Sequence, residues 1–314
     1  MAGCGWGDCL SMQRIVDVRT AALSHPTYLT LGNFDGMHRG HAALLGQLRA
    51  VADQHTPVAQ TALLTFDPHP LTVLRPQIAH HLLTTPAERL VLGEQLSIDF
   101  GIIQPFNLEI AALSAQVFVE LLKAHLNLAG LVVGPDFALG RNREGTLDRL
   151  RELGQTLDYS VHVLEPIEWQ GHAVRSSVIR TFLREGDVTA AHTLLGRPYH
   201  ATGTVVEGDR RGRLLGTPTA NLQLAEAKLW PADGVYATRT WVTQPGTTQA
   251  DGTQLADGTL PGTQHPYWSV TNLGVRPTVD GVQRRFETHL LDFPPVGNDG
   301  NLYGQSVTVE FFAR

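Results

Sequence analysis

The chain has 314 residues, which at roughly 100–200 residues per domain predicts about two domains. Hydrophobic residues make up 42% of it, enough to build full cores, so a globally disordered chain is excluded. The net charge of −6 disfavours a protein that binds nucleic acid through a basic face. Lys123 and Lys228 are the only lysines, and the absence of any Gly-Lys-Ser/Thr sequence excludes a P-loop.

Cysteine usage and hydropathy indicate the compartment. Cys4 and Cys9 are the only cysteines, so neither a disulfide framework nor a cysteine-based metal site is expected. The first residues lack the basic start and apolar core of a signal peptide, and no apolar run approaches the roughly 18 residues of a membrane span. We therefore expect a cytoplasmic protein with no membrane partner, in which residues 1–11 form an unstructured extension before Met12.

Residues 28–195 alternate short apolar runs with amphipathic stretches of helical length. Strands are expected at 28–31, 61–66, 130–133 and 160–164. Helices are expected at 41–52, 114–126, 146–157 and 177–184. This alternation is typical of an α/β domain, in which helices cover both faces of a parallel sheet and ligands bind beyond the carboxyl ends of the strands.

The hydrophobic period changes after Pro198. Runs of alternating polarity lie at 202–206, 234–243, 267–272, 285–291 and 306–312, separated by Gly, Pro and Asp turns. They predict a mostly antiparallel β-barrel, so we divide the chain into domains at 13–186 and 187–314. The segment 243–266 has almost no apolar residues and is expected to be a long solvated hairpin loop or a disordered insert.

The sequence Gly-Asn-Phe-Asp-Gly-Met-His-Arg-Gly-His occupies residues 32–41, between a predicted strand and a predicted helix. Its three glycines allow the backbone to approach a ligand closely, and the N-terminus of the following helix attracts anions. His38 and His41 lie on the first turn, where both could donate to charge that develops on a triphosphate. The alternatives are a zinc-binding histidine pair and a helix cap of ordinary polarity.

This segment resembles the His-x-Gly-His motif of nucleotidyltransferases. In its full length it is similar to the adenylyltransferase module of bifunctional riboflavin kinase/FAD synthetases. Three further segments agree with that family: Thr-Phe-Asp-Pro-His-Pro at 65–70, Gly-Pro-Asp-Phe-Ala-Leu-Gly at 134–140 and Arg-Ser-Ser-Val-Ile-Arg at 175–180. Leu139 stands where the family usually has Phe, and Arg175 and Ser177 alter its serine pattern.

The resemblance implies a Rossmann-like nucleotidyltransferase domain in which His38 and His41 are catalytic. It implies ATP or flavin binding by residues from four segments: Gly32, Asn33, Phe34, Asp35, Gly36, Gly40, Phe66, Asp67, Pro68, His69, Asp136, Ser176, Ser177 and Arg180. The last three would hold the ATP phosphates near a helix N-terminus. With so few lysines, the histidines, Arg180 and backbone amides are expected to supply the positive potential.

A second glycine-rich segment, residues 203–221, ends in Pro-Thr-Ala-Asn. Its glycines suggest a loop that folds over phosphates, and its ending resembles the signature of riboflavin kinase. The resemblance implies ATP or flavin binding by Gly203, Gly208, Gly212, Arg213, Gly216 and Pro218. It implies that Thr219 and Asn221 hold Mg²⁺ between the ATP phosphates, and that Glu287 is the base for the flavin ribityl hydroxyl. The alternative for Glu287 is an exposed strand carboxylate.

The expected activity is the conversion of riboflavin to FMN and then of FMN to FAD, with ATP as the second substrate and Mg²⁺ as cofactor. In the family a last helix normally follows the strand that ends here at Phe312, so a C-terminally shortened kinase domain is expected. Two alternatives stay open: a monofunctional FAD synthetase with an inactive, flavin-binding kinase domain, and a non-catalytic flavin-binding or flavin-sensing protein. Small molecules are the expected partners, nucleic acid is not, and the chain is expected to be a monomer or weak homo-oligomer.

Overall fold

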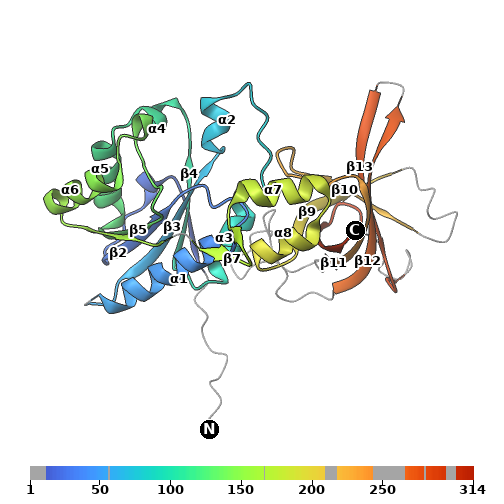
Figure 1. Cartoon of the computed structure of the whole chain (residues 1–314), viewed down its shortest axis with the longest axis horizontal. Coiled ribbons are helices and arrows are strands. Elements are labelled where there is room, and N and C mark those ends of the chain that lie inside the picture. The colour runs from blue at the N-terminus through green and yellow to red at the C-terminus, as the bar shows by residue number, and fades with distance from the viewer. Residues whose placement is uncertain are drawn as a thin grey trace, which may run out of the picture. The chain divides into compact units, whose positions relative to one another are not determined.

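The structure, a computed structural model, describes residues 12–55, 57–165, 167–208, 218–242, 266–278, 281–294 and 302–314 (Figure 1). The expected extension at 1–11 and nearly all of the expected insert at 243–266 lie outside these ranges. The chain forms two compact units. The N-terminal unit comprises Met1–Phe34, Gly40–His80 and Arg89–Ile167, and the barrel unit comprises Asp35–Arg39, His81–Glu88 and Glu168–Arg314. Two short segments from the first half of the chain therefore belong to the barrel unit.

The N-terminal unit contains a six-stranded parallel sheet in the order β1-β4-β3-β2-β5-β6. Its strands are β1 (Gln13–Val16), β2 (Thr27–Leu31), β3 (Gln60–Asp67), β4 (Phe100–Pro105), β5 (Leu128–Val133) and β6 (Ser160–Val163). Every residue of β2 is buried, as are the central residues of β3, which is typical of strands with both faces covered. The expected α/β class with a parallel sheet is confirmed.

Helices connect these strands and lie on both sides of the sheet, with α1 on one side and α5 and α6 on the other (Figure 1). They are α1 (Arg39–Gln54), α2 (Pro70–Leu74), α3 (Pro86–Glu94), α4 (Leu108–Ala112), α5 (Ala115–Leu126) and α6 (Leu147–Leu157), with 3-10 turns η1 (Val18–Thr20) and η2 (Arg141–Arg143). Ser114 and Thr146 cap α5 and α6 by accepting the amides of Val117 and Arg149. These caps fix the starts that the sequence predicts for the two helices.

The barrel unit contains a closed antiparallel barrel in the order β10-β13-β12-β11-β14-β9. Its strands are β9 (Tyr199–Val206), β10 (Ala220–Leu224), β11 (Gly234–Val242), β12 (Pro266–Thr278), β13 (Gly281–Leu290) and β14 (Ser306–Ala313). The same unit holds the hairpin β7 (Glu168–Trp169) and β8 (His172–Ala173) and the helices α7 (Ser176–Glu185) and α8 (Val188–Leu195). The expected barrel is confirmed, with β10 as a strand that the sequence pattern misses.

Alternating burial along β13 separates the inside of the barrel from its outer face. Phe286, Thr288 and Leu290 are buried, and the Phe286 ring packs edge-on against Phe311 at 5.9 Å between centroids. Glu287 and His289, between them, are partly exposed. Because successive side chains of a strand point to opposite faces, both project from the outer face of the barrel wall.

Candidate active sites

The segment 32–41 forms a strained loop between β2 and α1. Phe34, Gly36 and Met37 have φ values of 46°, 88° and 39°. Left-handed backbone angles are uncommon for residues with large side chains, such as Phe34 and Met37. Such a conformation persists only where neighbouring groups hold the backbone in place. The loop therefore depends on the contacts that its remaining residues make.

Asp35 makes several of these contacts within the barrel unit. Its carboxylate is almost fully buried, accepts the amides of Leu83 and Thr84 at 3.1 and 2.9 Å, and forms an ion pair with Arg180 of α7. Its backbone oxygen accepts the Ser176 hydroxyl at 2.7 Å. Asp35, Ser176 and Arg180, which the sequence assigns to one site, are thus brought together at the first turns of α7.

The N-terminus of α7 retains features suited to an anion. Its N-cap, Arg175, makes no side-chain capping hydrogen bond, and Ser177 is exposed on the first turn. Backbone N–H groups at such an end point toward an incoming phosphate, and the helix dipole favours its negative charge. The Arg180 charge, in contrast, is largely engaged by Asp35.

His38 immediately precedes α1 and is buried. Burial is the main cause that lowers its pKa to about 4, and the nearby Arg197 charge acts in the same direction. The ring is therefore neutral at pH 7. A neutral imidazole still donates one N–H, so His38 suits hydrogen bonding to developing charge. It does not supply the positive charge that the sequence predicts for the histidines.

The lowered pKa of His38 predicts an acid-sensitive stability. The pKa falls from 6.5 to about 4 on folding, so the unfolded chain binds more protons between these values. The free energy of unfolding should therefore decrease as the pH falls from about 6.5 to about 4, by on the order of 3 kcal/mol from this group. Urea denaturation at several pH values should give a shallower decrease for His38→Gln than for the wild type. Equal slopes in the two proteins would refute this effect.

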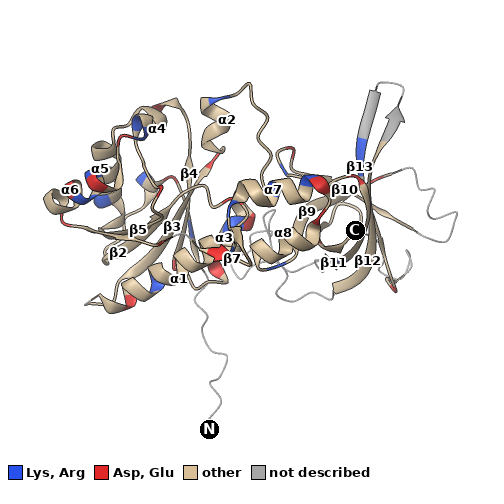
Figure 2. Cartoon of the chain, viewed as in Figure 1, with Lys and Arg blue, Asp and Glu red and all other residues tan. Residues whose placement is uncertain are grey.

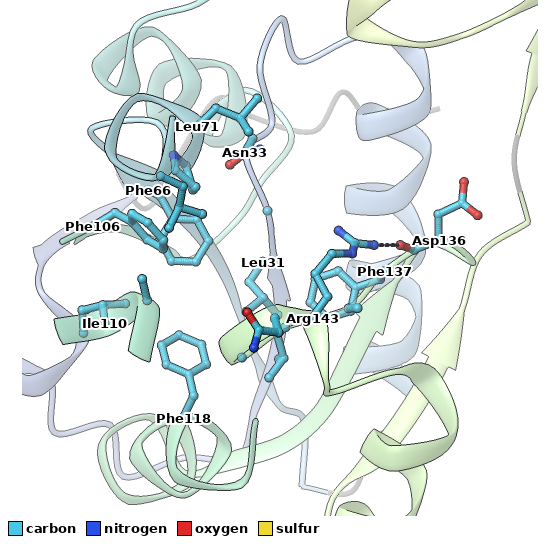
Figure 3. A pocket seen from close by; sticks show the side chains of 18 residues that line it. Leu31, Asn33, Phe66, Leu71, Phe106, Ile110, Phe118, Asp136, Phe137 and Arg143 are labelled. Atoms are coloured by element: carbon cyan, nitrogen blue, oxygen red, sulfur yellow. Dashed lines mark hydrogen bonds between the residues drawn. The ribbon is translucent and has the colours of Figure 1, made fainter. Parts of the chain in front are cut away.

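The N-terminal unit holds an apolar pocket at the carboxyl ends of β2, β3 and β5, with a volume of about 610 Å³. Figure 3 shows Phe66 and Phe106 side by side, with Phe118 below them. The rings of Phe66 and Phe106 pack edge-on with centroids 5.4 Å apart. Asn33, Asp136, Phe137 and Arg143 also line the pocket, and Arg143 donates to the Asp136 backbone oxygen at 2.8 Å. A flat aromatic ring system fits a cavity with this lining.

Other predicted residues of this unit have identifiable structural roles. His69 is buried, its Nδ1 accepts the Leu71 amide at 3.2 Å as the N-cap of α2, and its ring stacks on His80 at 4.0 Å. Asp67 and Pro68 are exposed at the end of β3. His41 lies on the first turn of α1, where its ring contacts that of Phe34 at 5.1 Å. Gly32 and Gly40 belong to the 32–41 segment and lie on either side of its residues with positive φ.

The sequence interpretation missed Arg89, which is fully buried in the N-terminal unit. Its guanidinium donates to the Thr65 hydroxyl at 3.0 Å, and that hydroxyl donates to the Asn33 backbone oxygen at 3.2 Å. Arg89 therefore joins the ends of β2 and β3. A single arginine on an amphipathic helix gives no sequence signal for such a role.

The second set of predicted residues meets on the outer face of the barrel. Asn221 of β10 lies directly opposite Glu287 of β13, and Asn272 of β12 lies opposite Glu287 on its other side. Directly opposite residues of antiparallel strands share a face, so three oxygen-bearing side chains stand in one row. Glu287 is partly exposed and has the Arg285 guanidinium 3.5 Å away.

Residues before β10 complete this row. The Pro218 backbone oxygen lies 2.7 Å from Nδ1 of His289, two residues after Glu287 on the same face. Thr219 is exposed one residue before β10. Gly203 permits the pairing of β9 with β10, because a Cβ there would lie 2.7 Å from the Gln223 backbone oxygen. The loop residues Gly212, Arg213 and Gly216 lie outside the described residues.

Gly208 has a steric role beside Asn221. A Cβ at this position would collide with the Asn221 side-chain amide. Gly208→Ala should therefore displace that amide and reduce riboflavin phosphorylation about tenfold or more, since misplacement by ~1 Å can cost ~100-fold. Initial rates of FMN formation test this, with Gly46→Ala, which meets open space in α1, as the control. An unchanged rate for Gly208→Ala would mean that the Asn221 position is unimportant.

The zinc alternative for His38 and His41 finds no further ligands. Among the described residues, no three His, Cys, Asp or Glu side chains are grouped so that they could hold a metal ion. In that same part of the chain, no helix is both long enough and apolar enough to cross a membrane.

Comparisons with known proteins match two successive segments of the chain. The FAD synthetase family model matches residues 20–178, and the riboflavin kinase family model matches residues 195–314. The parallel α/β domain matches the FAD synthetase model, and the barrel matches the riboflavin kinase model. Together they define a two-domain transferase that acts on flavins. The chain belongs to the bifunctional riboflavin kinase/FMN adenylyltransferase family. It is a bifunctional transferase of FAD biosynthesis that proceeds through FMN, which confirms the expected family and function.

Two relatives named as bifunctional riboflavin kinase/FMN adenylyltransferases are identical to the chain at about a third of the aligned residues. The protein of Escherichia coli strain K12 is 35% identical over 283 residues, covering 90% of this chain and 82% of the relative. That of Bacillus subtilis is 31% identical over 313 residues, covering 95% and 90%. A solved structure titled as a macrolide-efflux protein from Streptococcus pneumoniae is 28% identical, with a TM-score of 0.79 and coverage of 96% and 91%.

Proposed function

We propose that the chain adenylylates FMN with the His38 loop and phosphorylates riboflavin on the outer face of its barrel. One observation supports this assignment: Asp35, Ser176 and Arg180 form one cluster of contacting residues, and Asn221, Asn272 and Glu287 form a second. One cluster surrounds Asp35, and the other surrounds Glu287. We place the adenylyltransferase domain at residues 13–186 and the kinase domain at 187–314.

In the adenylyl transfer, an oxygen of the FMN phosphate attacks the α-phosphorus of ATP, and the bond to the departing pyrophosphate breaks. The phenylalanine-lined pocket supports binding of the flavin ring. The N–H groups at the start of α7, with Ser177, would hold ATP phosphates. His38 and His41 would donate hydrogen bonds to charge on the transferring group, a role that a neutral imidazole can fill.

In the phosphoryl transfer, Glu287 would accept the proton of the ribityl hydroxyl as its oxygen bonds to the γ-phosphorus of ATP, and ADP leaves. Its partial exposure and its place between Asn221 and Asn272 support contact with a substrate. The oxygen atoms of Thr219 and Asn221 are the hard donors that Mg²⁺ prefers, so these residues fit the ion. When bound, Mg²⁺ would neutralise charge on the ATP phosphates.

Small molecules would be the only partners of a cytoplasmic monomer or weak homo-oligomer. The net charge of −6 supports the exclusion of nucleic acid. On α6, basic residues are interspersed with acidic ones (Figure 2), and Arg149 and Arg151 pair with Glu152 and Asp148 at 2.9 and 3.0 Å. No basic face arises on that helix.

Product analysis tests the proposal. Purified protein with ATP and Mg²⁺ should form FMN and then FAD from riboflavin, and FAD with pyrophosphate from FMN. FAD formed from FMN but no FMN from riboflavin would show the monofunctional alternative. Flavin binding without ATP consumption would show a binding or sensing protein instead.

A further inference from the structure

Arg197 lies between α8 and β9, inside the segment matched by the riboflavin kinase model, yet it contacts the loop of the other signature. Its Nη2 donates to the Gly36 backbone oxygen at 2.8 Å, and its Nη1 donates to the Met37 backbone oxygen at 2.9 Å. All three residues belong to the barrel unit. A planar guanidinium fork can bind two successive carbonyls in this way, and the single ammonium of a lysine cannot.

The two carbonyl groups that Arg197 binds belong to residues in the strained part of the loop. Gly36 and Met37 both have positive φ, and His38 follows directly. Met37 has a side chain, so its left-handed conformation has to be stabilised by external contacts. The Arg197 fork fixes the peptide groups on either side of Met37, and thereby the backbone from which the His38 ring projects.

A second group from the kinase segment supports the same loop. Lys228 is fully buried, and its Nζ donates to the Leu83 backbone oxygen at 2.8 Å and to Glu88 at 2.6 Å. Leu82 pairs with the adjoining backbone, donating to Ala227 at 2.7 Å. This anchors the segment whose Leu83 and Thr84 amides bind the Asp35 carboxylate. The loop is thus held at Asp35 and at Met37 by contacts that lead to the kinase segment.

We propose that Arg197 is a positioning residue for FMN adenylylation, although it lies in the kinase segment of the chain. It acts through the backbone of Gly36 and Met37, which sets the orientation of His38. The proposal rests on the assigned role of His38 in adenylyl transfer. Arg197 contacts neither Asn221 nor Glu287, so riboflavin phosphorylation should not depend on it.

Steady-state kinetics of both reactions on Arg197→Lys and Arg197→Ala test this proposal. Arg314→Ala is the matched control, since Arg314 also donates to two backbone oxygens of the barrel unit, those of Glu185 and Asp233. For both Arg197 variants, kcat for FAD formation should fall by about 10- to 100-fold, the range expected for a misplaced reacting group. The KM for FMN and the kinetics of riboflavin phosphorylation should stay within about twofold of wild type, and Arg314→Ala should keep both activities.

Guanidinium rescue separates positioning from a general loss of structure. Millimolar guanidinium chloride should restore at least part of FAD formation in Arg197→Ala, and methylammonium chloride, which lacks the fork, should not. If Arg197→Ala fails to fold, Arg197→Lys decides. Loss of FAD formation with phosphorylation retained supports the proposal, and retention or loss of both activities overturns it. If FAD formation survives in the Arg197 variants but is lost in His38→Ala, the inference fails and the proposed function stands.

Discussion

His41→Ala is expected to reduce the rate of FAD formation from FMN by about 100- to 1000-fold, the usual effect of removing one donor to developing charge. His41 lies on the first turn of α1, directly after the loop that holds His38. The sequence contains no P-loop lysine that could replace its N–H as a donor to the phosphates. Riboflavin phosphorylation should keep its wild-type rate, because its proposed base and metal-binding residues lie on β13, on β10 and directly before β10. Chromatographic separation of FMN and FAD over time measures both rates.

His25→Ala is the matched control for this change. His25 is an exposed histidine of the N-terminal unit whose ring contacts the Ser24 hydroxyl, and it belongs to neither signature sequence. It should leave FAD formation unchanged. If His41→Ala retained wild-type FAD formation, helix capping would be the better interpretation of that histidine.

Glu287→Gln is expected to reduce riboflavin phosphorylation by about 100- to 10,000-fold, the range attributed to general acid–base groups. The substitution keeps the shape of the side chain and its place opposite Asn221 and Asn272. It removes the carboxylate that would accept the hydroxyl proton. FAD formation from added FMN should be unaffected, because Glu287 lies on β13 between Asn221 and Asn272, which belong to the proposed kinase site.

The control for this substitution is Glu226→Gln, an exposed glutamate of the barrel unit outside both clusters. Rates of ADP release with riboflavin as acceptor should distinguish the two variants. Wild-type phosphorylation by Glu287→Gln would leave Glu287 as an ordinary exposed strand carboxylate, which is the alternative that its spacing allows.

Hydrophobic periodicity and continuous apolar runs predict the elements whose burial follows a simple pattern. Helices α5 and α6 begin after Ser114 and Thr146, and β2 and β3 are apolar runs with both faces covered. β4 escaped because Gly101 and the buried Gln104 interrupt its pattern. Gln104 is satisfied by the Val18 amide at 2.9 Å, a contact between residues 86 positions apart. Such partners are invisible to a local pattern.

The candidate sites divide in the same way. Residues inside the two signatures could be selected from motif order, because contiguous sequence carries that signal. Arg89, Arg197 and Lys228 could not, since each acts on a backbone or side-chain group far away in the chain. The structure also changes the interpretation of Asp35, which the sequence offers as a ligand-binding residue. Its buried carboxylate binds backbone amides and Arg180, so we now propose that it holds the loop in place.

A complementation assay between two variants tests whether one chain carries two independent sites. With riboflavin, ATP and Mg²⁺, His41→Ala alone should accumulate FMN, and Glu287→Gln alone should form FMN about 100- to 10,000-fold more slowly than wild type. An equimolar mixture of the two variants should form FAD, because FMN released by the first is adenylylated by the second. Failure of the mixture, with each variant deficient in both half-reactions, would contradict two separate sites.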